Sequence, residues 1–127
     1  MRFLNMIKGP ENVGPPPNAL MVAIAKLGEE AMKAGVLIET GGLFPSAMGA
    51  KVRLSGGNLT VSDGPFAETK ELIGGYAVYE VKSKQEAIGW ASRFMQLHVD
   101  HWPGWEGEAE IRQIFDAPSS SPKPGKD

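Results

Sequence analysis

Residues 61–76 have the sequence VSDGPFAETKELIGGY and separate two stretches whose composition is typical of β-strands. Asp63-Gly64-Pro65 is a strong turn signal, because glycine tolerates positive φ and proline fixes its own φ. A turn does not by itself require the acidic and basic side chains that follow this one. We therefore expect this loop to carry the functional site.

The length and composition of the chain are typical of a single globular domain. Its 127 residues, 42% of them hydrophobic, are enough to bury a sizeable core. The net charge of −2, with both signs interspersed, favours neither nucleic acid nor any other polyanion as a partner. The chain has no cysteine, which excludes disulfides, thiolate catalysis and cysteine metal sites. Its first apolar run is too short for a secretion signal or a membrane span, so we expect a cytoplasmic protein without membrane contact.

The N-terminal pattern predicts a strand, a helix and a second strand. Residues 3–7 are short and apolar and are followed by Gly9-Pro10. Residues 18–34 carry apolar side chains at helical spacing, with Asn18 expected as the N-cap and Gly35 as the C-terminal stop. Residues 36–39 then form the second strand.

A β-hairpin is predicted over residues 51–62, turning at Gly56-Gly57. A two-residue loop sets the register, so that apolar residues pair on one face, which we expect to be half-buried. The expected pairs are Leu54 with Leu59 and Val52 with Val61, with Arg53 and Thr60 on the other face.

The C-terminal half predicts a strand, a helix and a last strand. Residues 73–81 are apolar almost throughout, which indicates a central strand covered on both faces. Ser83 and Glu86 form a capping box that starts a helix running to about His98. Residues 110–115 are the final strand. The tail, residues 117–127, is rich in Ser, Pro, Lys and Gly and is expected to be disordered, which leaves a domain of residues 1–116.

This order of elements, β-α-β, hairpin, β-α-β, predicts an α+β fold. Two split β-α-β halves are typical of a ferredoxin-like sandwich, here with an inserted β-hairpin. Both helices would cover one face of a mainly antiparallel sheet and leave the other face to be buried in another way.

Three pieces of the chain resemble the signature of YCII-related proteins of the DGPF-domain type: Asp63-Gly64-Pro65-Phe66, residues 67–71 (AETKE) and Gly74-Gly75-Tyr76. Residues 42–46 (GLFPS), Leu97-His98 and residues 102–107 (WPGWEG) fit the same family. The resemblance implies a homodimer in which two chains pack sheet to sheet as a dimeric α/β barrel. It is specific for the family and not for a reaction, because a shared fold does not imply a shared function.

Asp63 is the first candidate for catalysis. Its carboxylate would act as a general acid or base in a cleft, with its pKa raised by partial burial. The alternative is structural, an Asx-turn in which the carboxylate accepts backbone N–H bonds and orders the loop. Glu68 and Lys70 are more typical of a solvated loop. Ligand contacts are expected from Gly64, Pro65, Phe66, Glu71, Ser46 and Tyr76.

His98 is the second candidate, as a hydrogen-bonding residue or proton carrier, because histidine titrates near neutral pH. His98 and His101 could face one way on a helix, but no third ligand stands at a suitable spacing, so we expect no metal. No dinucleotide or phosphate-binding glycine pattern is present, so no cofactor is expected. Related YCII proteins resemble lyases or dehydrochlorinases that use a His–Asp pair with the histidine early in the first helix. This chain has no histidine there, so the pair would be Asp63 with His98.

The sequence therefore predicts a small-molecule-binding protein, in the form of a lyase-like acid–base enzyme with a cleft around Asp63. The alternative is a non-catalytic binding or regulatory module, since some DGPF-type domains are associated with extracytoplasmic-function sigma factors. A large enclosed pocket with a buried carboxylate would favour the enzyme. A filled cleft and exposed apolar surface would favour the module.

Overall fold

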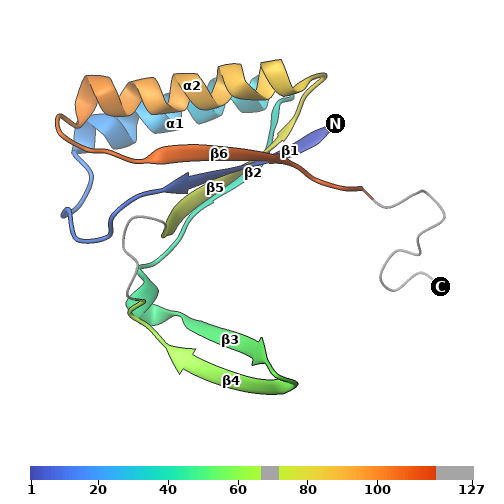
Figure 1. The fold of residues 1–127 in the computed structure, drawn as a ribbon. Coiled ribbons are helices and arrows are strands. Elements are labelled where there is room, and N and C mark those ends of the chain that lie inside the picture. The colour runs from blue at the N-terminus through green and yellow to red at the C-terminus, as the bar shows by residue number, and fades with distance from the viewer. Residues whose placement is uncertain (67–71, 117–127) are drawn as a thin grey trace.

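The computed structural model describes residues 1–66 and 72–116, and within these ranges the chain folds as two helices and two antiparallel sheets (Figure 1). The tail and Glu68, Lys70 and Glu71 of the loop lie outside the described residues. The elements are β1 (Arg2–Lys8), α1 (Asn18–Lys33), β2 (Leu37–Gly42), the short helix η1 (Ser46–Met48), β3 (Ala50–Ser55), β4 (Asn58–Asp63), β5 (Ile73–Glu80), α2 (Lys84–His101) and β6 (Glu108–Gln113).

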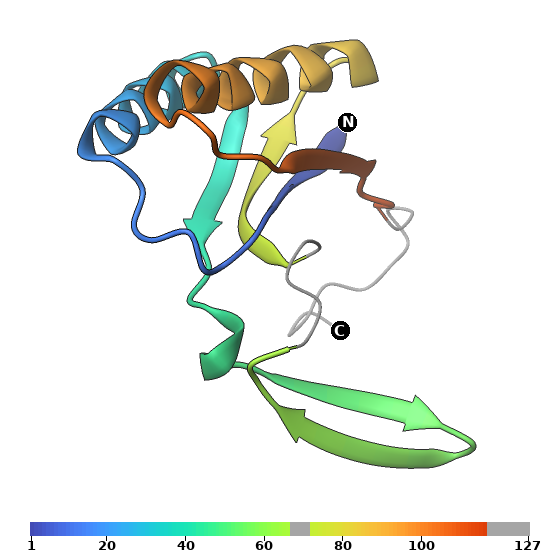
Figure 2. The ribbon, with the colours of Figure 1, turned by 60° about the vertical axis from the view of Figure 1, so that its left-hand side comes forward.

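The main sheet has the strand order β2-β5-β1-β6, and every neighbouring pair is antiparallel. With one helix after β1 and one after β5, this is the predicted ferredoxin-like split β-α-β sandwich. Both helices lie on one face of the sheet, and no described helix covers the other face (Figure 2). The predicted central position of this strand is confirmed, because β5 lies between β2 and β1, whereas cover on both of its faces stays a prediction.

The hydrophobic core lies between this sheet and the helices. Alternate residues of β1 point toward it, and Phe3 and Asn5 are buried there. Phe3 packs with Tyr79 of β5 and Ala87 of α2. Leu20 is the largest fully buried apolar side chain of α1. Burial of such side chains supplies most of the free energy that holds helices against a sheet.

The start of α1 differs from the prediction, whereas the start of α2 agrees with it. α1 begins at Asn18, its N-cap is Pro17, and no side chain caps it, so the expected Asn18 cap is wrong. Pro17 already has the extended conformation that an N-cap requires, at φ −58° and ψ 146°. At α2 the Ser83 hydroxyl accepts a hydrogen bond from the Glu86 N–H at 3.1 Å, as predicted.

Strand and helix ends follow long-range pairing more than local pattern. β2 starts at Leu37 and continues to Gly42, beyond the predicted residue 39, because it pairs with β5 as far as Gly75. β6 starts at Glu108, two residues before the prediction, because Glu108 pairs with Lys8 of β1. α2 extends past His98 to His101, and Gly35 has the φ of +76° expected after a helix.

The second sheet is the hairpin β3–β4, which projects away from the main sheet (Figures 1 and 2). Its predicted register is confirmed, and both turn glycines, Gly56 and Gly57, have positive φ. The predicted half-burial is wrong, because every residue of both strands is exposed. The apolar pairs Leu54–Leu59 and Val52–Val61 are 68–70% exposed, since no described element packs on them.

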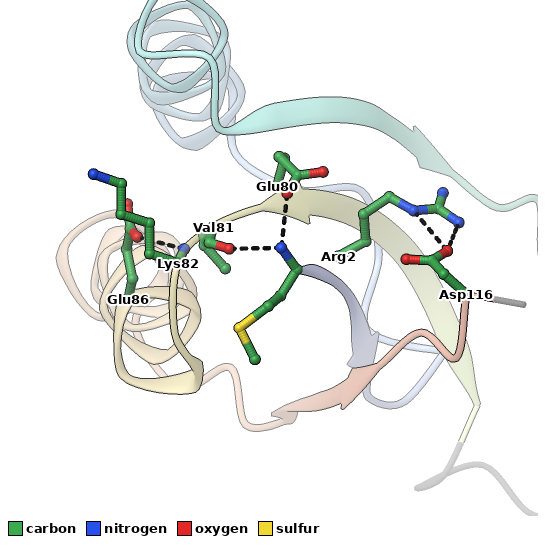
Figure 3. A network of polar contacts seen from close by, with 7 residues as sticks. Arg2, Glu80, Val81, Lys82, Glu86 and Asp116 are labelled. Carbon is green, nitrogen blue, oxygen red and sulfur yellow. Dashed lines mark hydrogen bonds and ion pairs between the residues drawn. The ribbon is translucent and has the colours of Figure 1, made fainter. Parts of the chain in front are cut away.

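Polar contacts close the end of the sheet where β1 begins (Figure 3). The Met1 amino group donates to Glu80 Oε2 at 2.8 Å and to the Val81 carbonyl at 3.0 Å. Arg2 binds Asp116, after β6, through its Nε at 3.2 Å and through Nη2. These contacts tie β1 to the ends of β5 and β6.

In the described ranges, 1–66 and 72–116, no helix is both long and apolar enough to cross a membrane.

Candidate functional site

The Asp63–Phe66 segment packs tightly against the loop that precedes β3. The Gly64 N–H donates to the Gly49 carbonyl at 3.0 Å. A Cβ at Gly64 would lie 1.6 Å from the Ser46 carbonyl oxygen, so only glycine allows this approach. The Phe66 N–H donates to Ser46 Oγ at 3.1 Å, and the Phe66 ring lies 4.3 Å from Lys51 Nζ. Gly64 and Phe66 therefore fasten the base of the hairpin.

Ser46 holds this packing together with a residue that the sequence analysis missed. Its N–H and its hydroxyl donate to the two carboxylate oxygens of Glu11, at 2.6 and 2.9 Å. Because Ser46 Oγ also accepts from Phe66, its hydrogen-bonding capacity is taken up within the protein. Glu11 stands 35 residues earlier in a proline-rich loop, where no local pattern indicated its partner.

Asp63 ends β4 and is exposed. Within residues 1–66 and 72–116 its carboxylate makes neither a hydrogen bond nor an ion pair, and therefore no Asx-turn bond either. Pro65 is exposed as well. Glu71, the remaining acidic candidate of this loop, lies outside the described residues.

Tyr76 of β5 is bound to strand β2. Its hydroxyl donates to Glu39 Oε2 at 2.7 Å, and this bond raises the pKa of the Tyr76 hydroxyl. Its ring covers Gly41, where a Cβ would come within 2.9 Å of it. The Thr40 hydroxyl donates to the Tyr76 carbonyl at 2.9 Å.

A cavity of about 600 Å³ lies between the two helices and the sheet. Its walls are mostly apolar and include Leu20 and Ile24 of α1, Ile7 and Ala77 of the sheet, and Trp90 and Phe94 of α2. The other two tryptophans, Trp102 and Trp105, line it too. His98 and Tyr76 are part of the wall, whereas Ser46 and the segment from Asp63 to Phe66 are not. The structure thus brings His98 and Tyr76 to one cavity and leaves Ser46 and the segment from Asp63 to Phe66 at the hairpin base.

Asn5 is a residue of this wall with a buried polar atom that lacks a partner. It is 1% exposed on the central strand β1, and its Nδ2 donates to the Tyr79 hydroxyl at 3.2 Å. No described group donates to its Oδ1. Burial raises the pKa of the Tyr79 hydroxyl, which therefore keeps its proton. A buried acceptor without a partner is rare and indicates either a functional role or an unfilled site.

His98 lines the same cavity, and its imidazole is neutral. Its Nδ1 lies 3.1 Å from the Phe94 carbonyl, which can only accept, so Nδ1 carries the hydrogen. Nε2 is then left as an acceptor, and in the described part of the chain no group donates to it. The imidazole is 7% exposed, and burial lowers its pKa below the usual range. Trp105, with ring centroids 4.5 Å apart, holds the ring in place.

The described wall carries one charged side chain, a carboxylate, and no cation. Of the described residues that line it, Glu11 is the one acidic residue, and both its oxygens are bound to Ser46. No lysine or arginine is part of the described wall. Nor do the described residues contain a group of three His, Cys, Asp or Glu able to hold a metal ion.

Comparison with known proteins identifies the family. The model of the YCII-related domain matches residues 1–98. The chain belongs to the YCII-related family. An uncharacterised protein of Rhizobium meliloti (strain 1021) is 40% identical over 60 residues, which are 47% of this chain. The match spans 48% of the length of that relative, about half of it.

The YCII-related match covers part of the cavity wall. Asn5, Tyr79 and His98 fall within residues 1–98, whereas Trp102 and Trp105 follow them. Asn5 was the detectable signal that sequence analysis passed over. It is the polar residue between the apolar residues 3–4 and 6–7 of this strand and has the same parity as Phe3, so it had to point into the core.

We predict that Gly64→Ala loosens the hairpin base. The new Cβ collides with the Ser46 carbonyl, so the free energy of unfolding should fall by about 1–3 kcal/mol or more. Gly42→Ala is the matched control, because a Cβ there meets nothing within 4 Å. Urea unfolding of both variants checks this. Equal stability of the two variants would contradict the close packing described for Gly64.

We also predict that stability falls as the pH drops from about 6.5, the pKa of a histidine in an unfolded chain. Burial lowers the pKa of folded His98, so the unfolded chain binds a proton that the folded chain does not, and stability rises with pH in this window. The carboxyls of Glu30 and Asp116, whose pKa values are lowered by bound arginines, act at more acidic pH.

His98→Gln should flatten this dependence between pH 7 and pH 5, because glutamine does not titrate. The measurement is the urea midpoint at four pH values in this range. A slope identical to that of the unchanged protein would show that His98 does not carry the effect.

Proposed function

We propose that this YCII-related domain binds a small molecule in the cavity between the helices and the sheet. The observation that carries the proposal is an apolar cavity of about 600 Å³ into which a few polar groups converge. Ligand sites in proteins typically have 300–1,000 Å³, aromatic walls and a few polar groups that fix the orientation of the ligand. Here those groups are Asn5, Tyr79 and His98.

His98 is the residue that we propose for acid–base chemistry. A neutral imidazole with Nδ1–H bound to a carbonyl presents Nε2 as a base. A depressed pKa keeps this base unprotonated at neutral pH, as a residue that removes a proton from a substrate requires. The reaction class is proton abstraction of the lyase type, with Tyr79 as a hydrogen-bond donor to the substrate. Asp63 would then act only at a separate site on the loop, because it is not part of this cavity.

We propose that the protein forms a homodimer. The helix-free face of the sheet carries the cross-strand pair Leu4–Val78 and Met6, all of them half-buried. The hairpin adds four apolar side chains that are 68–70% exposed. A two-stranded hairpin alone is marginally stable in water, so a second copy packed on both surfaces would stabilise it.

A non-catalytic binding or regulatory module in the cytoplasm is the second candidate function. The exposed apolar face of the hairpin favours it, because such patches mark interaction sites. An association with extracytoplasmic-function sigma factors belongs to this second proposal. Proton transfer that is lost in His98 variants would favour the enzyme. A bound ligand that the unchanged protein does not convert would favour the module.

We predict that 1-adamantanol, a compact and non-fluorescent alcohol, changes the tryptophan fluorescence. All three tryptophans of the chain line the cavity, so an occupant alters their surroundings directly. Ala77→Leu, opposite Asn5, should weaken the response by narrowing the cavity, while Asp63→Asn should leave the affinity within about twofold, because Asp63 lies elsewhere. Loss of binding in Asp63→Asn, with retention in Ala77→Leu, would refute this site.

We predict a solution mass of twice 13.6 kDa at micromolar concentration, measured by light scattering. Exchanging Leu54 and Leu59 for lysine should weaken the dimer without unfolding the chain, since both side chains are exposed within one chain. The matched control is Arg53→Lys with Thr60→Lys on the other face of the hairpin. A monomeric mass for the unchanged protein would contradict the homodimer.

A further inference from the structure

The polar side chains of the cavity wall determine which hydrogen bonds a ligand can make there. Three of them are already bonded within the protein: Glu11 to Ser46, Thr40 to the Tyr76 carbonyl, and Tyr76 to Glu39. Asn5, Tyr79 and His98 keep unused hydrogen-bonding positions, and the indole N–H groups of Trp90, Trp102 and Trp105 make no hydrogen bond to another described residue.

Two of the unused positions are acceptors. Asn5 Oδ1 has no partner in the described part of the chain, and its Nδ2 is already committed to the Tyr79 hydroxyl. His98 Nε2 is an acceptor because Nδ1 carries the hydrogen. Tyr79 receives the hydrogen bond from Asn5 and keeps its own O–H to donate. A ligand that satisfies the buried Asn5 Oδ1 must supply a hydrogen-bond donor, whereas a ligand acceptor can be met by the Tyr79 hydroxyl or by an indole N–H of the wall.

The wall has no compensation for a charged ligand. No lysine or arginine lines the described part of it, and the Glu11 carboxylate is occupied by Ser46. A carboxylate or phosphate placed there would lose its hydration without gaining a counter-ion, and Asn5 Oδ1 and His98 Nε2 would face it with lone pairs. A cation would find one anionic group in the described wall, the Glu11 carboxylate, whose two oxygens already accept from Ser46.

Packing of the core does not require a polar side chain at Asn5. It lies between Phe3 and Ile7 on the helix side of β1, where an apolar residue would satisfy packing without a buried unpaired oxygen. Polar groups that break the local rule in this way are expected at functional sites, where a bound molecule completes them.

We infer that the cavity selects a neutral, mainly apolar molecule that carries at least one hydrogen-bond donor, such as a hydroxyl, directed at Asn5 Oδ1. This inference rests on the proposed ligand-binding function and adds the chemical class of the ligand. An alcohol or amide N–H serves the site, whereas a ketone of the same size leaves Asn5 Oδ1 unpaired. An anion is disfavoured, because the described wall offers it no counter-ion.

The test compares three molecules with one carbon skeleton: 1-adamantanol, 2-adamantanone and adamantane-1-carboxylate. Each is titrated into the full-length protein at pH 7.5, and tryptophan fluorescence gives the Kd. The alcohol should bind about three- to tenfold more tightly than the ketone, the ratio that one net hydrogen bond supplies. The carboxylate should bind more weakly than both.

Asn5→Leu removes the acceptor while keeping the approximate size of the side chain. In this variant the ratio of alcohol to ketone affinity should fall to about one, while binding of the ketone is retained or improved. Should this variant fail to fold, the comparison of the three molecules on the unchanged protein decides by itself.

The outcomes distinguish a wrong ligand class from a wrong binding function. If the ketone or the carboxylate binds as tightly as the alcohol or better, the inferred ligand class is wrong, while the cavity remains a binding site. If none of the three changes the fluorescence, the binding function itself is overturned. An unchanged preference for the alcohol in a folded Asn5→Leu variant would refute the role of Asn5.

Discussion

The antiparallel pairing of β1 with β5 is the constraint on which the rest of this structure depends. It brings Asn5 and Tyr79, 74 residues apart in the chain, within a hydrogen bond of 3.2 Å in an otherwise apolar layer. Both helices pack on the same face, so this polar pair cannot reach bulk water and has to be satisfied inside the protein. The tyrosine satisfies one side of the Asn5 amide, and Oδ1 on the other side has no partner among the described residues.

The sequence predicted one functional loop, whereas the structure has two separate features, the hairpin base and the cavity. The segment from Asp63 to Phe66 is a fastening, in which Gly64 and Phe66 hold the loop around Ser46 and so orient the hairpin. The cavity belongs to the β-α-β body. A buried carboxylate was the expected mark of an enzyme and exposed apolar surface that of a binding module. The structure has a cavity with a buried neutral histidine in place of that carboxylate, together with an apolar hairpin, so ligand binding and association can reside in different places.

Local rules predicted what local sequence determines. The turn glycines fixed the hairpin register, and Ser83 with Glu86 marked the start of α2. Features set by distant partners escaped prediction: the Glu11 contact with Ser46, the exposure of the hairpin, and the use of Pro17 in place of Asn18 as the helix cap. The candidate site was predicted in part, because His98 was recognised by its chemistry, but its companions Asn5 and Tyr79 look like core residues until the fold joins them.

A crystal structure of the protein soaked with 3-bromo-1-adamantanol tests the central claim, that the cavity between the helices and the sheet is the ligand site. The anomalous signal of bromine locates the molecule without prior assumptions. The account predicts a peak within the cavity, with the hydroxyl in hydrogen-bonding distance of Asn5 Oδ1 and the cage against Trp90 and Phe94. A peak beside Asp63 on the loop, with the cavity empty, would contradict it.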